Sequence, residues 1–234
     1  MNLSGCSKLR SLGSSAFGNE DRQITQIIER QRLRESGIVP TFVVRSHESF
    51  LSLSGCSALE EIGSNAFYHL KLEGKLDLSD CVALLNIGSS AFRCSRLSQL
   101  DLTSCVALKG IGFYAFAESM LRKLILSRCT ALERIGPGAF CFSGLIDLDI
   151  SGCAALLEIG DMSFNDAKLP TLDLSGCAAL EKIGMLAFAD SPLTKLDLRV
   201  PRRARPFRVG EMCFKSANEG IRFAGEVLAP AVYV

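Results

Sequence analysis

The sequence has almost none of the side chains from which proteins build acid–base or imidazole–metal sites. It contains no tryptophan and only two histidines, His47 and His69, among 234 residues. Histidine is the side chain best suited to proton transfer near neutral pH and is also the commonest metal ligand. The glycine-rich phosphate-binding, Gly-x-Ser-x-Gly and His-Glu-x-x-His motifs are absent as well. We therefore expect no catalytic residues, no cofactor and no metal site, and we predict that the protein is not an enzyme.

Long apolar runs and a surplus of one charge are also missing. No stretch approaches the roughly 18 consecutive apolar residues of a membrane-spanning helix, and no signal-peptide pattern follows Met1. Lysine plus arginine number 26 and aspartate plus glutamate number 25, so the net charge is +1. This balance provides no overall electrostatic attraction for nucleic acid or for an anionic membrane. We expect a monomer with no membrane span and no nucleic-acid partner; the compartment is not determined by the sequence.

The sequence does have enough apolar residues for a folded core, together with a strict internal repeat. Hydrophobic residues make up 48% of the chain and charged residues 22%, a globular composition. Seven of the ten cysteines recur at intervals of 50, 25, 24, 24, 24 and 24 residues: Cys6, Cys56, Cys81, Cys105, Cys129, Cys153 and Cys177. A glycine follows each of them seven residues later, and a phenylalanine follows eleven residues later. Three columns in one phase predict a repeat protein with one degenerate unit near its start.

One unit, residues 97–116, illustrates the local structure that we expect in every repeat. The alternation Leu100-Asp101-Leu102 predicts a short strand with both leucines on one face. Gly112 permits a backbone conformation that a side chain would oppose. In most units a small polar residue such as Ser89 follows this glycine, and it predicts a capped one-turn helix that directs Ala-Phe inward. A unit of this length cannot enclose a core alone, so the units stack and their strands pair into a parallel sheet.

These units resemble the leucine-rich repeat superfamily. The pattern Leu-x-x-Leu-x-Leu-x-x-Cys-x-x-Leu runs from Leu97 to Leu108 and recurs from positions 121, 145 and 169, with Ile150 replacing one leucine. The Ile-Gly-x-x-Ala-Phe that follows is similar to the BspA-like subgroup, which occurs in surface proteins of bacteria and protists. The resemblance covers residues 1–17 and 51–198.

The resemblance implies an α/β repeat solenoid. Its expected form is a leucine-rich repeat horseshoe or arc, with a concave parallel β-sheet and short helical turns on the convex side. It implies that the concave sheet binds partners, usually proteins or surface glycans, and it supplies no catalytic residues. It also favours a cell-surface location if the natural chain begins upstream of Met1.

We expect a single domain over residues 1–234 with two irregular parts. Residues 18–50 predict a degenerate coil with a helical insertion at 19–36 and a strand at 41–44. This helix could be an insertion that replaces one coil, a partner-binding helix, or an artefact of the gene model; the interval of 50 residues favours the first reading. Residues 199–234 predict an irregular C-terminal coil and tail. The five arginines at 199–208 fit a solvated connection or a local contact with an anion or nucleic acid.

The cysteine column allows two chemical states. Neighbours in register on a parallel sheet lie about 4.8 Å apart, a distance that a disulfide tolerates. An odd count, at a position that is a buried ladder in the family that the chain resembles, favours reduced thiols. A thiol is a small hydrophobe with a weak S–H donor, which suits a turn packed against carbonyls of the next coil. Without a Cys-x-x-Cys pair, structural zinc and thioredoxin-like chemistry are not expected.

Outward positions of the predicted strands form three columns on the concave sheet. The first is Lys75, Gln99, Lys123, Asp147, Thr171 and Lys195. The second is Asp77, Asp101, Ile125, Asp149, Asp173 and Asp197. The third is Ser79, Thr103, Ser127, Ser151, Ser175 and Arg199. The twelve residues of the first two columns are our candidate partner-binding residues. Aspartates at one strand spacing are expected to repel each other and to raise each other's pKa values.

Three interpretations of the aspartate column remain open. It could result from the copying of one acceptable polar residue down the repeat, form an acidic groove for a basic or cationic partner, or bind a divalent cation. The function most consistent with the sequence is a non-catalytic protein-binding domain that uses its concave sheet face for a protein or peptide, including a basic one. The alternative is a structural spacer or modular segment of a larger surface or receptor protein, with no independent binding activity.

Overall fold

The computed structural model of the chain describes residues 4–16, 50–71, 75–197, 207–215 and 222–223. These ranges contain strands of two kinds. The strands that begin each repeat are β2 (Phe50–Ser52), β4 (Lys75–Asp77), β6 (Gln99–Asp101), β8 (Lys123–Ile125), β10 (Asp147–Asp149), β12 (Thr171–Asp173), β14 (Lys195–Asp197) and β16 (Arg222–Phe223). The strands before the glycine column are β1 (Ser11–Leu12), β3 (Glu61–Ile62), β5 (Asn86–Ile87), β7 (Gly110–Ile111), β9 (Arg134–Ile135), β11 (Glu158–Ile159), β13 (Lys182–Ile183) and β15 (Arg208–Val209).

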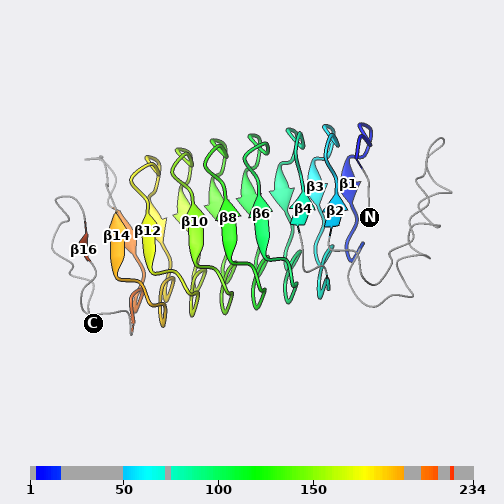
Figure 1. Ribbon diagram of the computed structural model, residues 1–234. Helices are drawn as coiled ribbons and strands as arrows, with labels where there is room; N and C mark the ends of the chain where they lie inside the picture. Colours follow the sequence, from blue (N-terminus) through cyan, green and yellow to red (C-terminus); the bar gives the residue numbers. More distant parts are fainter. Residues whose placement is uncertain (1–3, 17–49, 72–74, 198–206, 216–221, 224–234) are drawn as a thin grey trace.

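Each coil of the solenoid contains one strand of each kind. A turn at the cysteine joins the two strands, and a second turn at the phenylalanine leads to the next coil (Figure 1). Six complete coils begin at β2, β4, β6, β8, β10 and β12. The strands pair in parallel with equivalent residues opposite each other, for example Leu100 and Leu124. The expected parallel solenoid of stacked repeats is confirmed.

The solenoid has a second sheet that the sequence did not predict. The two-residue strands form one parallel sheet in the order β1-β3-β5-β7-β9-β11-β13-β15. In each complete coil their isoleucine is buried, as at Ile111. A Cβ atom added at Gly112 would lie 2.7 Å from the carbonyl carbon of Gly88, which is closer than real contacts allow. The glycine column is therefore required because adjacent backbones approach closely, and not because of a special backbone conformation.

The predicted helical turns after the glycine are wrong. The described residues contain no helix, and so none that could cross a membrane. Each phenylalanine turn from Phe67 to Phe188 has two residues in the left-handed region, such as Tyr114 (φ 53°) and Glu118 (φ 55°), which a right-handed helix does not accept. The N–H of Phe116 donates to the carbonyl of Ala139 in the next coil at 2.7 Å, where a helix would use a local carbonyl. Lateral hydrogen bonds thus replace helical ones.

This bonding also sets the spacing between neighbouring coils. Both sheets impose the strand spacing of about 4.8 Å, and the phenylalanine rings stack with centroids 4.8 to 5.7 Å apart. All sides of the stack therefore rise by nearly the same amount per coil. In the view of Figure 1 the coils from β2 to β14 lie side by side along one axis, and the expected horseshoe or arc with a concave sheet stays a prediction. We call the outer side of β2 to β14 the long-strand face.

The strands of the long-strand face belong to two sheets and not to one. Strands β10-β8-β6-β4-β2 form a five-stranded sheet, and β12-β14-β16 form a three-stranded sheet. At the position before β10, the N–H of Ile146 donates to the carbonyl of Arg122 at 3.0 Å. The equivalent residue before β12 is Pro170, which has no N–H to donate. This proline coincides with the break between β10 and β12.

The core consists of the columns that the repeat predicts. The phenylalanines have no exposed surface and stack in a continuous row: Phe67, Phe92, Phe116, Phe140, Phe164 and Phe188. Leucines and isoleucines from both sheets, and the cysteines at the connecting turns, complete one cluster along the stack. The predicted burial of Phe116, Phe140 and Phe164 is confirmed.

The first repeat packs directly on the second. Ser11 and Leu12 pair with Glu61 and Ile62, and the N–H of Gly5 donates to the carbonyl of Ser54 at 2.7 Å. These two rows are neighbours with no space for a coil between them, which differs from the expectation of a replaced coil at 18–50. The predicted helix at 19–36 lies outside the described residues. So does most of the arginine run, although Arg208 belongs to β15, which pairs with β13.

All ten cysteines, including the seven in register, are free thiols. The thiol of Cys81 donates to the carbonyl of Leu53, and that of Cys129 to the carbonyl of Leu102, both at 3.3 Å. These acceptors lie in the preceding coil and not in the following one. Burial raises the pKa of Cys81, Cys129 and Cys177 to about 12, so these groups remain protonated thiols at neutral pH.

Replacing Phe140 with alanine is expected to lower the free energy of unfolding by about 3–5 kcal/mol, the usual cost of removing a buried aromatic side chain. Phe142, two residues later, is 54% exposed. Phe142→Ala should therefore cost less than about 1 kcal/mol. Urea denaturation of both variants measures these losses, and equal losses would show that the phenylalanine column is not the core.

Titration with a thiol reagent should find all ten cysteines in the protein denatured without reductant. In the folded protein only Cys6 and Cys94, which are half-buried, should react readily, because burial protects the other eight. Loss of thiols in pairs from the denatured, unreduced protein would contradict this prediction.

Candidate functional site

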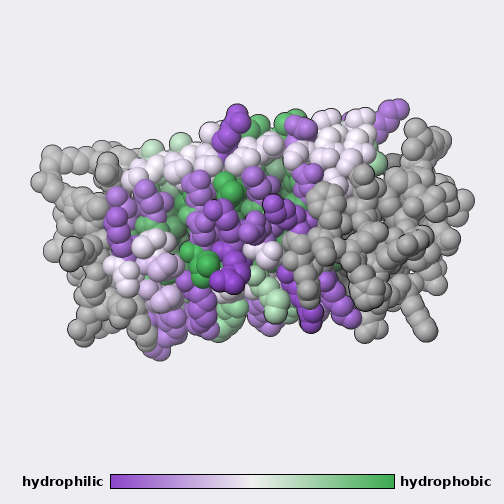
Figure 2. Space-filling view, viewed as in Figure 1, coloured by the Kyte–Doolittle hydropathy of each residue, from purple (hydrophilic) through white to green (hydrophobic). Residues whose placement is uncertain are grey.

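The strand pleat places the candidate residues on the long-strand face. In β4, β6, β8, β12 and β14 the central leucine is buried, whereas the residue on each side is exposed or half-buried. Strand β10 differs, because Leu148 is only half-buried beside the sheet break. Figure 2, in the same view as Figure 1, shows mainly hydrophilic side chains across the middle of this side, with small hydrophobic patches.

The strand register brings the predicted columns together in two groups. Lys75, Gln99, Lys123 and Asp147 follow one another across β4 to β10 as paired neighbours. Thr171 and Lys195 pair separately in the second sheet, as do Asp173 and Asp197. The predicted six-row columns are therefore interrupted between β10 and β12.

Four aspartates of the second column have the same structural role. The Oδ1 atom of each accepts a hydrogen bond from the backbone N–H two residues later, which closes the turn after the strand. The N–O distances are 2.9, 2.9, 3.1 and 2.8 Å for Asp77, Asp101, Asp149 and Asp173. The hydroxyls of Ser79 and Ser151 donate to the same Oδ1 atoms at 2.5 and 2.7 Å. Repetition of aspartate in this column thus has a reason in the fold itself.

The expectation that the aspartates raise each other's pKa values is wrong for Asp77 and Asp149. Burial raises the pKa of each carboxyl, but hydrogen bonds from the hydroxyl and N–H two residues later outweigh it. The pKa of each is therefore lowered from its ordinary value. These bonds require the ionised form, so both side chains remain negatively charged down to lower pH than an ordinary aspartate.

Asp147 is paired with a lysine and does not add an isolated charge to the face. Its Oδ2 atom lies 2.6 Å from Nζ of Lys123 in the adjacent coil. The hydrogen bond and charge of Asp147 raise the pKa of Lys123. Both side chains are about half exposed, so solvent screens the pair and its contribution to stability is small. In the second column Ile125 stands where the other five rows have aspartate, which separates Asp101 from Asp149.

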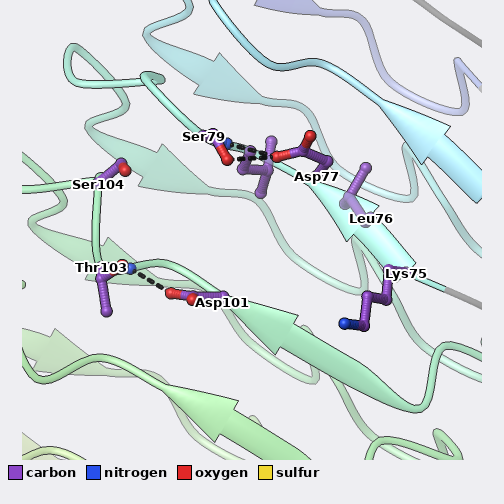
Figure 3. A pocket seen from close by; sticks show the side chains of 8 residues that line it. Lys75, Leu76, Asp77, Ser79, Asp101, Thr103 and Ser104 are labelled. Carbon is purple, nitrogen blue, oxygen red and sulfur yellow. Dashed lines mark hydrogen bonds between the residues drawn. The ribbon is translucent and has the colours of Figure 1, made fainter.

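An open pocket of about 270 Å³ lies on this face between β4 and β6 (Figure 3). Its polar lining comes from both strands and from the turns that follow them: Lys75, Asp77, Ser79, Asp101, Thr103 and Ser104. Three of these are candidate residues from the first two columns, and two belong to the third. Ser104 was not predicted; the signal in the sequence is that this turn position holds glycine at Gly5 and Gly55 and serine here.

The structure offers no grouped ligands for the divalent-cation interpretation. Among the described residues, no three or more histidine, cysteine, aspartate or glutamate side chains lie together so as to hold a metal ion. The aspartates of the second column instead direct one oxygen each into their own turns.

The repeats identify the family of the chain. A model described as the BspA type leucine rich repeat region matches residues 10–146 and 133–219, in six copies. The protein belongs to this family of leucine-rich repeat proteins, as the motif suggested. A search of curated proteins found no match.

Three solved structures are similar. The pneumococcal vaccine antigen PcpA aligns over 92% of this chain and 67% of its own, with 18% identity and a TM-score of 0.45. A leucine-rich cell surface protein from Faecalibacterium prausnitzii covers 64% and 47%, with 18% identity and a TM-score of 0.38. The functional domain of InlJ from Listeria monocytogenes, described as including a cysteine ladder, covers 70% and 42%, with 15% identity and a TM-score of 0.33. The chain spans less than half the length of the last two.

The aspartate turns predict a pH dependence. The pKa of Asp77 and of Asp149 is lower in the folded chain than the unfolded value near 3.9. Their stabilisation is therefore complete above that unfolded value and is lost as the pH falls through the folded value. The double variant Asp77→Asn/Asp149→Asn keeps the oxygen acceptors but cannot titrate. Between about pH 6 and pH 3 its melting temperature should fall less than that of the parent.

A matched control is Asp80→Asn/Asp190→Asn, which removes two exposed carboxylates outside the second column. This control should retain the acid sensitivity of the parent. The turn hydrogen bonds would have no role in acid stability if both double variants followed the parent curve.

Proposed function

We propose that the chain is a non-catalytic binding domain whose long-strand face recognises a protein or peptide that carries basic groups. The observation that carries this proposal is the aspartate column. Asp101 and Asp173 are exposed, and each uses Oδ1 in its turn, so the rest of the carboxylate faces the surface. Membership of a leucine-rich repeat family supports a binding role, and lysines between the aspartates suit a partner that carries both charges.

The attraction would be mainly electrostatic. The face has few aromatic side chains from which to build a hydrophobic centre of binding energy. Exposed charges are screened over about 8–10 Å near physiological ionic strength, so affinity should fall as salt rises. A surface location, which the family resemblance implies, forms part of this proposal.

A second candidate function is that of a spacer within a longer surface protein. The observation that favours it is the regular spacing of the coils, which pair in parallel and stack their phenylalanine rings 4.8 to 5.7 Å apart. In that case the long-strand face would bind no partner, and the distance between flanking domains would be the functional property.

The triple variant Asp149→Asn/Asp173→Asn/Asp197→Asn tests the binding proposal. At positions 149 and 173 the amide oxygen of asparagine can still accept the turn hydrogen bond, and all three substitutions keep the size of the side chain while three negative charges are removed. We expect binding of a fluorescent peptide of alternating arginine and serine, measured by anisotropy at low salt, to weaken by at least tenfold. The melting temperature should stay constant or rise slightly.

The matched control removes three carboxylates from the other sheet and its flanks, as Glu61→Gln/Glu133→Gln/Glu211→Gln. It has the same net charge as the test variant and should bind the peptide like the parent. If both variants weaken peptide binding equally, the loss of binding is explained by net charge alone and not by the position of the aspartates. Unchanged binding by the aspartate variant would overturn the proposal and leave the spacer function.

A further inference from the structure

The turn after the long strand has two forms along the solenoid. In the first three rows its third residue is in the left-handed region, at Gly5 (φ 76°), Gly55 (φ 72°) and Asp80 (φ 63°). From the row of Ser104 onward, the described residues at this position do not have a positive φ. The change of form falls between the turn that follows β4 and the turn that follows β6.

The ladder between these two strands opens at the same point. In four other coils the leucine after the strand donates its N–H to the next coil, as Leu53 does to Asp77 at 2.8 Å and Leu126 to Asp149 at 2.7 Å. Among the described residues, no hydrogen bond joins the equivalent pair, the N–H of Leu78 and the carbonyl of Asp101. The strand register is consistent with this missing hydrogen bond, because β4 and β6 pair over two residues whereas β6 and β8 pair over three. Within the described ranges, the equivalent bond between Ile150 and Asp173 is also missing, at the break between the two sheets.

The pocket of about 270 Å³ lies at this opening (Figure 3). Its wall from β6 contributes Asp101, whose Oδ1 is held by the following turn. Its wall from β4 contributes Asp77, whose Oδ1 is held in the same way and whose Oδ2 accepts a long hydrogen bond of 3.4 Å from the hydroxyl of Ser52. These bonds fix the direction of both carboxylates before any ligand arrives. The hydroxyls of Ser79, Thr103 and Ser104 surround them. The opening therefore combines two oriented carboxylates, three hydroxyls and a backbone carbonyl that lacks its usual partner.

We propose that this pocket is the anchor site for one arginine side chain of the basic partner, which rests on the binding function proposed above. A guanidinium group is planar and carries five N–H donors, so it needs several acceptors placed around its edge. The carboxylates of Asp77 and Asp101 face it from two strands, and the carbonyl of Asp101 and the hydroxyls accept from its remaining donors. A lysine ammonium has three donors and is more strongly hydrated, so it loses more on leaving water than it gains here.

Lys75 sets the preference for the residues beside that arginine. Lys75 lines the same pocket, and its ammonium group is positively charged, as is the guanidinium group of the ligand. It repels a second cation, and it favours an acidic or neutral neighbour in the partner sequence. A lone arginine flanked by uncharged residues thus fits the pocket better than a polybasic run.

The test uses the whole chain and an acetylated, amidated peptide Gly-Ser-Arg-Ser-Gly, with two analogues in which lysine or citrulline replaces arginine. Nuclear magnetic resonance titration of the isotope-labelled chain follows the amide signals. We expect the arginine peptide to shift the signals of Leu78, Asp101 and Thr103. The lysine peptide should bind about tenfold more weakly, and citrulline, which lacks the charge, should not bind measurably.

Three variants distinguish the pocket from the general charge of the face. Asp101→Asn should lower the affinity for the arginine peptide about tenfold, because one of two charged acceptors becomes neutral. Asp173→Asn removes an equally exposed aspartate that has the same turn bond and lies outside this pocket, and it should change the affinity less than twofold. Lys75→Gln removes the like charge and should raise the affinity for the arginine peptide.

The outcomes separate this inference from the proposed function. If Asp101→Asn and Asp173→Asn weaken binding equally, or if arginine and lysine peptides bind alike, the pocket is not an arginine site, although the face can still attract basic partners. If the triple aspartate variant above binds normally while Asp101→Asn does not, the arginine site is supported and the proposal that the wider acidic face binds the partner is rejected. Absence of any shift at Leu78 and Asp101 overturns the inference.

Discussion

The structure depends on one constraint, which is that neighbouring coils must match at a single strand spacing on every side. Backbone hydrogen bonds impose this spacing in both sheets, and phenylalanine rings that stack with centroids 4.8 to 5.7 Å apart maintain it at the remaining wall. The close approach at Gly112, where no Cβ fits, follows from the same constraint. Each of these sides therefore rises by nearly the same amount per coil.

Identical coils leave functional variation to positions that the stack does not use. The interior repeats leucine, isoleucine, cysteine and phenylalanine with little change, whereas outward positions and turns can vary without loss of the core. The informative places are therefore the departures from the repeat. Pro170 coincides with the break in the long-strand sheet, Ile125 interrupts the aspartates, and the change of turn at Asp80 and Ser104 coincides with the pocket. A feature that recurs in several coils, such as the aspartate turn, is explained first by folding.

Much of the fold could be predicted because the repeat has one phase from end to end. A column that recurs every 24 residues must lie in a row once the units stack, so the burial of Phe140 and the outward position of Asp173 followed from spacing alone. The second sheet could not be predicted in this way, since its strands have only two residues and no alternation to detect. The helical turns were predicted from a local capping pattern, but lateral bonds such as that from Phe116 to Ala139 satisfied the same backbone groups.

The sequence by itself determined the repeat, its register, its buried columns and the set of outward side chains, because these depend only on periodicity and polarity. Tertiary structure alone decided what the outward side chains do. The hydrogen bonds from Ser79 and Ser151 lower the pKa of aspartates that spacing suggested would be raised. Lys123 neutralises Asp147 across one coil, and the unmatched turns after β4 and β6 leave a pocket where the columns are otherwise continuous. Such contacts depend on angles and distances between neighbouring coils, which the aligned repeat sequences do not specify.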